Sequence, residues 1–466
     1  MKKPFKNPFR HHRAKNRNKP RGYSPTQIIC VSFVIVIALG TLLLSLPIAS
    51  RYGRMRVIDA MFTATSATCV TGLVVRDTWT QFTVFGQAVI LVLIQVGGLG
   101  LVTLTSFFNL VVGKKLGLRG MKLASESINS TSFGDVPHLL RMIFTFTLTV
   151  ESIGAVLLGL YFVPAYGLHG VFIAIFLAVS AFCNAGFDIL GFLGEYTSLM
   201  TFNGRYLVIF TIMALIIVGG LGFIVWNDLL AYRKTKTLLL HTKVVLLTTA
   251  FLIFIGTVCF MLFEWNNPAT LQPMGMKEKI GASLMQSVTM RTAGFNSVDL
   301  YAMRDSTKVF SIVLMFIGAA PGSTGGGIKV TTIAVIIMTA VSIIRGKEEP
   351  YLLKRRIAAN VVYRSLAILF LGVVTVGVTA ITLMATSPLE ANGLTGIDAT
   401  FEAVSAFATV GVSSGSTAIG SPFSKIMLIL SMFIGRVGPV SFGLSLAAQQ
   451  NVSRKLIVPE GRIVVG

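Results

Sequence analysis

Long apolar segments recur along the whole chain, separated by stretches rich in Ser, Thr, Gly and charged residues. A membrane-spanning helix needs about 20 mostly apolar residues, and eight segments reach that length. They are Ile28–Ala49, Phe82–Val112, Leu139–Val163, Tyr206–Leu230, Lys243–Phe263, Val309–Ile344, Val361–Ala385 and Ser424–Ala447. The pattern predicts an all-α polytopic membrane protein with eight transmembrane helices.

Four shorter segments between the long ones repeat a single pattern, a small-residue helix that leads to a glycine. They are FTATSATCVTG (Phe62–Gly72), FLAVSAFCNAG (Phe176–Gly186), MQSVTMRTAG (Met285–Gly294) and FEAVSAFATVG (Phe401–Gly411). In the first, second and fourth, a Phe stands ten residues before the glycine and a Ser six before it; the third is one residue shorter. Four such units predict a ring of helix–pore helix–helix repeats around a central pore. Because glycine adopts backbone angles that other residues avoid, its loops can turn carbonyl oxygens inward to replace an ion's hydration shell.

Composition supports a membrane protein independently of these repeats. Hydrophobic residues make up 53% of the chain and charged residues only 12%, which is not typical of a soluble domain. We expect no secretory signal peptide, because the basic amino-terminal region is long and the first apolar segment is long enough to span a membrane.

The net charge of +22 is concentrated at the ends of every second apolar segment. The first 27 residues hold nine Lys or Arg and no acid. Further clusters are Lys114, Lys115, Arg119 and Lys122; Arg233, Lys234 and Lys236; Arg345, Lys347, Lys354, Arg355, Arg356 and Arg364; and Arg454, Lys455 and Arg462. Under the positive-inside rule these segments and both termini are cytoplasmic. The charge therefore indicates topology and attraction to anionic lipid rather than nucleic-acid binding. Arg51, Arg54 and Arg56 are exceptions, since this topology places them outside.

This topology predicts that the four short helices enter the membrane from the external side. Asp59 and Asp398 stand thirteen residues before Gly72 and Gly411, where an acid caps the positive end of a helix. The opposite, negative end would then point to the membrane centre and favour a cation. Ordinary helix capping without any relation to permeation is the alternative role of the aspartates.

A second glycine repeat lies in the helix that follows each short one. Its members are Gly97-Gly98-Leu99-Gly100, Gly219-Gly220-Leu221-Gly222, Gly318-Ala319-Ala320-Pro321 and Gly435-Arg436-Val437-Gly438. Such glycines indicate close packing or a bend. The third copy differs, because Gly318–Lys329 (GAAPGSTGGGIK) cannot continue an α-helix. Irregular backbone at membrane depth must be buried or line a water-filled path, so we expect an intramembrane loop rather than a kink. The segment is not a phosphate-binding P-loop: Gly322 and Gly327 have the spacing of that motif, but Ile328 stands where the motif has its lysine.

Three charged residues are predicted to lie at membrane depth, where charge is costly. Arg436 would oppose a cation, bond to the carbonyls of the facing loop, or serve a structural partnership. Lys329 belongs to the loop or extends to the cytoplasmic surface. Glu151 is interpreted as an anchor between helices, with an ion ligand as the alternative. Neither the four cysteines nor the five histidines form a metal or catalytic pattern, so an enzyme is not expected.

These motifs together resemble the Trk/Ktr/HKT superfamily of potassium transporters. The four glycine loops, PGSTGGGIK and GRVGP carry the resemblance, which runs from about Pro20 to the end. The first apolar segment is followed directly by the first glycine loop, with no extra pair of helices before it. This feature and the ending PEGRIVVG are most similar to the bacterial KtrB type of membrane subunit. The resemblance implies four M1–pore helix–M2 units, a homodimer with one pore in each protomer, and a cytoplasmic ring of RCK-type subunits (KtrA-like) that bind adenine nucleotides.

The function implied by the resemblance is potassium uptake down the electrochemical gradient across a bacterial plasma membrane, with sodium stimulation left open. No covalently bound cofactor is expected. Backbone carbonyls would hold K⁺ in a selectivity filter formed by Val70, Thr71, Gly72, Asn184, Ala185, Gly186, Thr292, Ala293, Gly294, Thr409, Val410 and Gly411. Glycine in all four loops matches the potassium-selective pattern of the family, whereas a serine in the first loop is associated with sodium.

The resemblance also implies a gate. Its residues are Gly318, Pro321, Gly322, Ser323, Thr324, Gly325, Gly326, Gly327, Lys329 and Arg436. Two other classes are alternatives: a secondary transporter for an organic solute, which would need dedicated polar side chains, and a membrane scaffold without transport, which leaves the repeated loops unexplained.

The predicted organisation follows these repeats. It comprises a basic cytoplasmic tail (1–27), pore unit 1 (28–112), a cytoplasmic loop (113–138), pore unit 2 (139–232), pore unit 3 (243–345) with its intramembrane loop (318–329), pore unit 4 (361–448) and a cytoplasmic carboxy-terminal tail (449–466).

Overall fold

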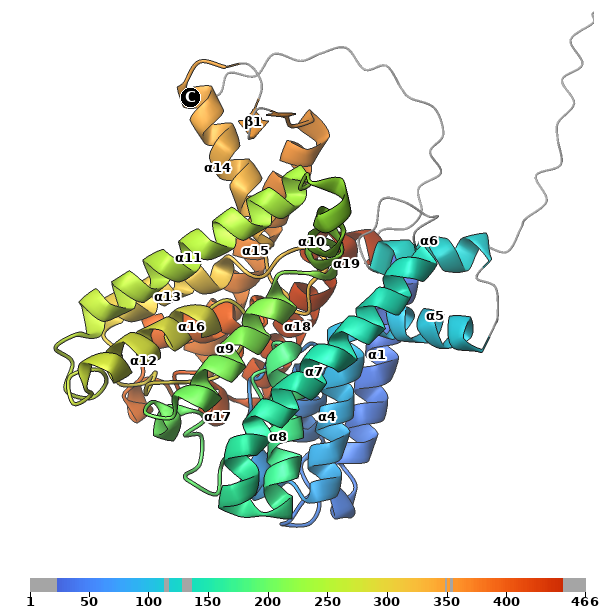
Figure 1. The fold of residues 1–466 in the computed structure, drawn as a ribbon. Coiled ribbons are helices and arrows are strands. Elements are labelled where there is room, and N and C mark those ends of the chain that lie inside the picture. Colours follow the sequence, from blue (N-terminus) through green and yellow to red (C-terminus); the bar gives the residue numbers. More distant parts are fainter. Residues whose placement is uncertain (1–22, 113–116, 128–135, 348–349, 353–354, 447–466) are drawn as a thin grey trace, which may run out of the picture.

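The computed structural model describes residues 23–112, 117–127, 136–347, 350–352 and 355–446. This part of the chain consists of helices, the loops that join or interrupt them, and one antiparallel pair of two-residue strands, β1 (Tyr351–Leu352) and β2 (Arg355–Arg356). The prediction of an all-α polytopic protein with four repeated units is confirmed (Figure 1).

Each unit consists of a long first helix, a short pore helix and a broken second helix. The first helices are α1 (Pro25–Leu44), α7 (Val136–Tyr166), α11 (Leu240–Glu264) and α15 (Ala359–Thr386). The pore helices are α2 (Val57–Thr68), α8 (Leu168–Phe182), α12 (Met276–Thr289) and α16 (Gly396–Phe407). The second helices are α4 (Val84–Leu99) with α5 (Leu101–Val111), α9 (Tyr206–Gly220) with α10 (Phe223–Thr235), α13 (Asp305–Phe316) with α14 (Val330–Ile344), and α18 (Pro422–Val437) with α19 (Pro439–Leu446). Short helices between them are α3 (Thr78–Gln81), α6 (Leu118–Ser127) and α17 (Ser416–Ile419).

The pore helices form the centre of the protein. Nine of the twelve residues of α2 and nine of the twelve of α16 are buried, and most are Ala, Ser or Thr. Small side chains let the surrounding helices approach closely. The phenylalanine that recurs ten residues before the glycine is fully buried in all three copies, at Phe62, Phe176 and Phe401. Met285 fills the corresponding place in the third unit. The repeat therefore supplies one large apolar anchor for each pore helix.

Three of the second helices bend sharply at a glycine. The angle is 87° between α4 and α5, 92° between α9 and α10, and 100° between α18 and α19. Gly100, Gly222 and Gly438 stand at the breaks with φ of 81°, 90° and 90°, which favours glycine. The bend that the sequence offered as one interpretation of these glycines is therefore present, and only the first halves of these segments run alongside the pore helices.

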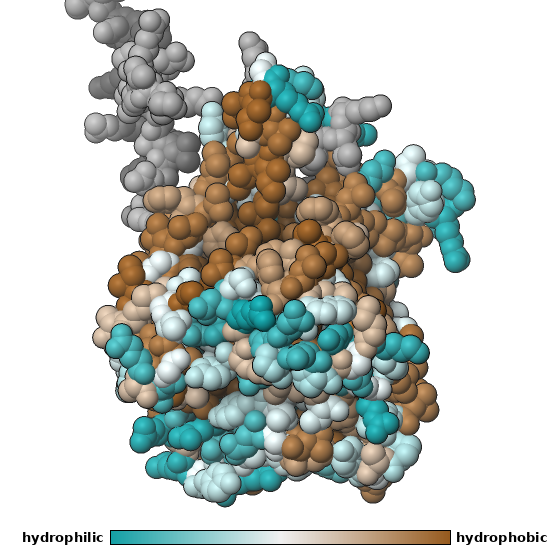
Figure 2. Space-filling model, turned by 90° about the vertical axis from the view of Figure 1, so that its left-hand side faces the viewer, coloured by the Kyte–Doolittle hydropathy of each residue, from teal (hydrophilic) through white to brown (hydrophobic). Residues whose placement is uncertain are grey.

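An apolar surface surrounds this core. The helices α1, α7, α11 and α15 are long and apolar enough to cross a membrane, and the two helices of each bent pair together reach the same length and apolar character. The remaining span, α13 with α14, is interrupted by a loop. Figure 2 shows a broad apolar region with hydrophilic residues gathered towards one end of the molecule. Exposed Leu39, Val156, Phe254 and Phe370 lie on the four long helices. This distribution suits a protein whose sides face lipid.

Candidate ion-conducting site

The four glycine loops share an unusual backbone conformation. Val70, Asn184, Thr292 and Thr409 have φ of 57°, 58°, 70° and 52°. Positive φ is uncommon for residues other than glycine, and such strain persists only where the surroundings hold it in place. Two residues later, Gly72, Gly186, Gly294 and Gly411 have φ of 94°, 69°, 81° and 89°. The loops are thus equivalent in backbone geometry as well as in sequence, including the third with its shorter spacing.

The four glycines meet around one centre and leave no room for a side chain. A Cβ atom on Gly72 would lie 2.5 Å from the carbonyl oxygen of Ala185. A Cβ on Gly186 would lie 2.5 Å from the Cα of Gly294, and a Cβ on Gly411 would overlap the carbonyl oxygen of Thr71. Real Cβ atoms do not approach so closely. Glycine is required here by space as well as by backbone angle.

Buried hydroxyls hold these loops in place. The serine six residues before the glycine accepts its N–H at 3.1 Å in the first and fourth loops, through Ser66 and Ser405. In the second loop, the Oγ of Ser180 donates to the carbonyl of Phe187 at 2.6 Å. The repeated serine thus fixes the backbone of these three loops, a role that its spacing alone did not predict.

Two buried polar residues that the sequence analysis did not single out act in the same way. Glu402 in α16 accepts the N–H of Ser414 at 3.3 Å and the hydroxyl of Thr417. Gln286 in α12 accepts the hydroxyl of Ser297 at 3.0 Å. The two residues occupy equivalent places, nine and eight residues before their glycines. Each ties the chain that leaves a loop to its own pore helix.

The second glycine repeat explains how the pore helices are supported. A Cβ on Gly97, Gly219 or Gly435 would overlap the carbonyl oxygen at the end of a pore helix, that of Thr68, Phe182 or Phe407 respectively. These glycines therefore serve close packing, while Gly100, Gly222 and Gly438 serve the bend. The sequence offered close packing and a bend as explanations for this repeat, and each explanation holds at different glycines.

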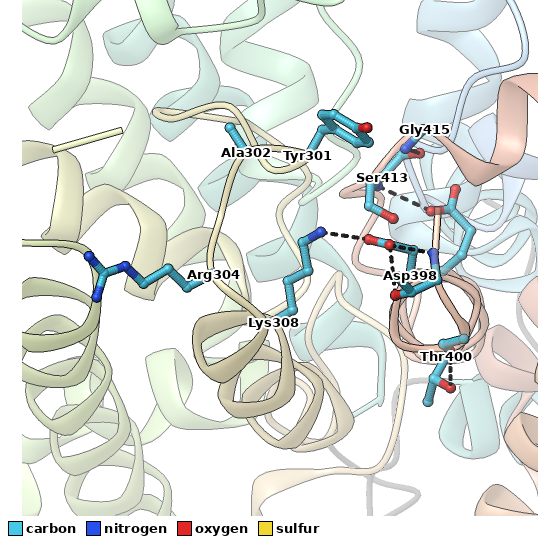
Figure 3. Close-up of polar contacts among 12 residues, drawn as sticks. Tyr301, Ala302, Arg304, Lys308, Asp398, Thr400, Ser413 and Gly415 are labelled. Carbon is cyan, nitrogen blue, oxygen red and sulfur yellow. Dashed lines mark hydrogen bonds and ion pairs between the residues drawn. The ribbon is translucent and has the colours of Figure 1, made fainter. Parts of the chain in front are cut away.

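Two buried ion pairs join neighbouring units. Lys308 of α13 lies 2.7 Å from Asp398 of α16 (Figure 3), and Lys425 of α18 lies 2.7 Å from Asp59 of α2. Each lysine stands ten residues before its glycine, Gly318 or Gly435. The pairs link the third unit to the fourth and the fourth to the first. They fix the amino-terminal ends of two pore helices, α2 and α16, against a neighbouring unit.

The aspartates differ in their second role. Asp398 also accepts the N–H of Thr395 at 2.9 Å and so caps α16, as expected. At the start of α2 no side chain makes a capping hydrogen bond. Asp59 therefore serves the ion pair rather than a cap.

Breaking one of these pairs is expected to destabilise the fold. Asp398→Asn leaves Lys308 buried at 4% exposure without a counter-charge, which typically costs about 3–5 kcal/mol. Replacing both residues by apolar ones, as Lys308→Met with Asp398→Leu, is expected to recover most of the loss. Thermal melting of detergent-solubilised protein, followed by size-exclusion chromatography, measures both. A double variant no more stable than Asp398→Asn contradicts this account.

The second helix of the third unit is interrupted by a loop, where the sequence predicts an intramembrane loop, and the length of the interruption excludes a simple kink. Helix α13 ends at Phe316, and α14 begins only at Val330. The N–H of Ala320 donates to the carbonyl oxygen of Gly220 at 3.1 Å. The hydroxyl of Thr324 donates to the carbonyl oxygen of Phe182 at 3.1 Å. The loop is therefore held against the second unit and lies directly beside the pore helices.

Arg436 reaches from the fourth unit to the first unit and to this loop. Its guanidinium donates to the carbonyls of Thr324, Gly97 and Gly98, the last at 3.2 Å. The residues that the structure describes include no ion pair between Arg436 and a carboxylate. Of the roles left open by the sequence, bonding to the facing loop is the one observed.

The other two charges at depth also have partners. Lys329 donates to the carbonyl of Gly325 at 2.6 Å, so it closes the loop on itself instead of extending to the surface. Glu151 accepts the amide of Gln95 at 3.2 Å and lies beside Cys183 at the end of α8. This geometry favours the interpretation of Glu151 as an anchor between helices.

Two cavities lie near the glycine loops. One of about 310 Å³ is lined by all four glycines of the loops together with Asp77, Asp188 and Asp299. The other, of about 660 Å³, is lined by Gly98, Arg436 and half of the residues of the intramembrane loop, Lys329 among them. An acidic cavity thus adjoins the glycine loops, and a basic one adjoins the intramembrane loop.

Four repeated units around a ring of glycine loops, with one cavity at the ring and another at the intramembrane loop, are typical of a membrane protein that transports cations. The sequence profile of the TrkH family, described as cation transport proteins, matches residues 5–455, and the chain belongs to this family. Membership confirms the resemblance and the prediction of a transporter rather than an enzyme.

Individual relatives agree. Ktr system potassium uptake protein B of Bacillus subtilis is 40% identical over 95% of this chain and 97% of its own length. Potassium/sodium uptake protein NtpJ of Enterococcus hirae is 38% identical over 95% and 97%. The crystal structure of the potassium transporter TrkH from Vibrio parahaemolyticus shares the fold, with a TM-score of 0.69 and 17% identity over 92% of this chain and 86% of that one.

Proposed function

We propose that this chain is the ion-translocating subunit of a Ktr-type system that takes potassium into a bacterial cell across the plasma membrane. The observation that carries the proposal is the fourfold ring of loops with one shared backbone conformation. The names of the relatives from Bacillus subtilis and Enterococcus hirae, which cover nearly the whole chain, support potassium as the cargo.

In this proposal the ion loses its water in the ring and is held by backbone carbonyls of the twelve filter residues named above. Four pore helices direct their negative ends to the centre, where they favour a cation. Hydrogen bonds from the loops to Ser66, Ser405, Gln286 and Glu402 hold the carbonyl groups in position. Rings of backbone carbonyls that replace the hydration shell of K⁺ form the selectivity filters of potassium channels.

Sodium is the second candidate. The relative from Enterococcus hirae is named for uptake of both ions, so sodium is either a second cargo or a stimulating ion. Uptake of ⁸⁶Rb⁺ and ²²Na⁺ into proteoliposomes that contain the purified protein tests the proposal and separates the cargoes. Flux no greater than in empty liposomes, with or without a co-purified partner, would exclude it.

The gate is proposed to be the intramembrane loop with Lys329 and Arg436. Its support is the position of the loop between the glycine ring and the basic cavity, together with the carbonyl bonds that hold it. With the loop in this position the path is closed, and its displacement would open it.

Regulation and assembly follow the Ktr systems in this proposal: a homodimer in lipid, both termini cytoplasmic, and a nucleotide-binding RCK ring below. Exposed Arg233, Lys234 and Lys236 lie at the carboxy-terminal end of α10 and Arg345 at that of α14, and they offer basic docking surfaces on that side. The amino-terminal tail, Lys114, Lys115, Lys354 and the carboxy-terminal tail (447–466) lie outside the described residues.

External pH is expected to change potassium affinity through Asp188, which lines the outer cavity. Burial, reinforced by the negative charge of Asp77, raises the pKa of Asp188 to about 6. The carboxyl is therefore charged at pH 7 and neutral at pH 5. Losing one charge near the ions should weaken the apparent affinity about threefold, for a distance of several ångströms in a wet cavity.

Initial uptake rates measured at external pH 7 and pH 5 test this. Asp188→Asn should behave at both values like the wild type at pH 5. Glu195→Gln, which removes an exposed acid on the same loop, is the matched control and should retain the pH dependence. A pH response that persists in Asp188→Asn assigns it to another group.

A further inference from the structure

The intramembrane loop touches the fourth glycine loop through one hydrogen bond. The N–H of Gly326 donates to the Oγ1 of Thr409 at 3.0 Å, and both residues are buried. Thr409 is the residue with φ of 52° two positions before Gly411. A side chain of the glycine ring itself therefore holds the intramembrane loop.

Space at this contact is as restricted as in the ring. A Cβ on Gly326 would overlap the Oγ1 of Thr409, and a Cβ on Gly325 would overlap the Oγ1 of Thr292. The loop thus rests on threonines of the third and fourth glycine loops. Only glycine allows its backbone to come so near, which accounts for part of the run of three glycines.

The conformation of the fourth loop does not need this hydroxyl. The equivalent residue of the first loop is Val70, whose φ of 57° is close to the 52° of Thr409. Valine has the shape of threonine without its hydroxyl. The hydroxyl of Thr409 is therefore available for a separate task, and the N–H of Gly326 is the partner that the structure shows for it.

We propose that Thr409 is a positioning residue that latches the intramembrane loop shut. The inference rests on the proposed gate. When the loop moves away from the ring, the N–H of Gly326 leaves the Oγ1 of Thr409, and the latch is lost. Thr409 would thereby belong to the loop that binds the ion and also hold the gate closed.

The chain supplies a matched control for the variant that tests the latch. Thr409→Val removes the hydroxyl that bonds to the intramembrane loop. Thr147→Val in α7 removes another fully buried threonine hydroxyl, which lies outside the glycine loops and has no partner among the described residues. A neutral hydrogen bond contributes modestly, so Thr409→Val should raise ⁸⁶Rb⁺ flux without a regulatory partner about two- to tenfold. Thr147→Val should leave it unchanged.

Three further variants sharpen the result. Thr409→Ser keeps the Oγ and should return the flux to the wild-type value. Gly326→Ala acts from the other side of the contact and should raise flux by pushing the loop from Thr409. Thr409→Val should add nothing in a protein that lacks residues 323–326. Preference for Rb⁺ over Na⁺ should stay the same in Thr409→Val. A changed preference without increased flux would place Thr409 in selection and overturn the latch.

Hydrogen–deuterium exchange reads the latch without any transport. Peptides that cover residues 318–329 should exchange faster in Thr409→Val than in the wild type and in Thr147→Val. Unchanged exchange in Thr409→Val overturns the latch, whichever ion the protein carries. Faster exchange in a protein that moves no potassium would support the latch and refute the proposed function, so the two failures are distinguishable.

Discussion

Serine in place of Gly72 or Gly294 is expected to reduce the preference for potassium over sodium. Both glycines have positive φ, of 94° and 81°, and a Cβ on either would lie within 2.6 Å of backbone atoms of the second glycine loop. A residue held in such a conformation costs about 1–3 kcal/mol. If the loop relieves that strain by moving its carbonyls, the preference should fall roughly five- to hundredfold.

The control is a glycine without these constraints. A Cβ on Gly377 in α15 meets no atom within 4 Å, so Gly377→Ser should keep the wild-type preference. Competition between ⁸⁶Rb⁺ and Na⁺ in proteoliposomes measures all three variants. Equal preference in Gly72→Ser, Gly294→Ser and the wild type would remove the filter assignment.

Removing the charge of Arg436 is expected to raise basal potassium flux. Arg436 joins the loop at Thr324 to the end of α4 at Gly97 and Gly98. Hydrogen bonds to a charged group contribute about 1.5–3 kcal/mol, so Arg436→Gln should favour the displaced loop by roughly 10- to 100-fold. Glutamine keeps one amide donor but cannot reach all three carbonyls.

A double-mutant cycle decides where Arg436 acts. Deleting residues 323–326 should raise flux and reduce dependence on the regulatory subunit. In that background Arg436→Gln should have little further effect, because both changes relieve one barrier. Additive increases would show that Arg436 repels ions directly or acts by packing. Loss of flux in a deletion that still folds would favour a purely structural loop.

Most of the pore architecture could be predicted because it is local in sequence. Apolar length marks the spans, and small residues before a glycine mark each pore helix and its loop. Proline with three glycines between Gly318 and Lys329 excludes a helix wherever that segment lies. Even the serine of the repeat, whose role was missed, is visible as a fixed spacing at Ser66, Ser180 and Ser405.

The contacts between units could not be predicted in this way. Lys425 and Asp59 are 366 residues apart, and Lys308 and Asp398 are 90 apart. In the sequence, each lysine stands near the end of an apolar segment, where exposure to water is equally compatible. Glu402 and Gln286 lie among small residues that do not reveal which loop returns to them.

The sequence by itself therefore determined the class of the protein, the four pore loops and the position of the break in the third unit. These depend on apolar length and on the backbone limits of glycine and proline, which each short segment carries alone. Only the tertiary structure decided the bends of 87–100° at Gly100, Gly222 and Gly438, the ion pairs, and the contacts of Arg436 and Thr409 with the loop. Their energies depend on groups brought together from different units, because a hydrogen bond or ion pair contributes no stability until both partners lie within contact distance.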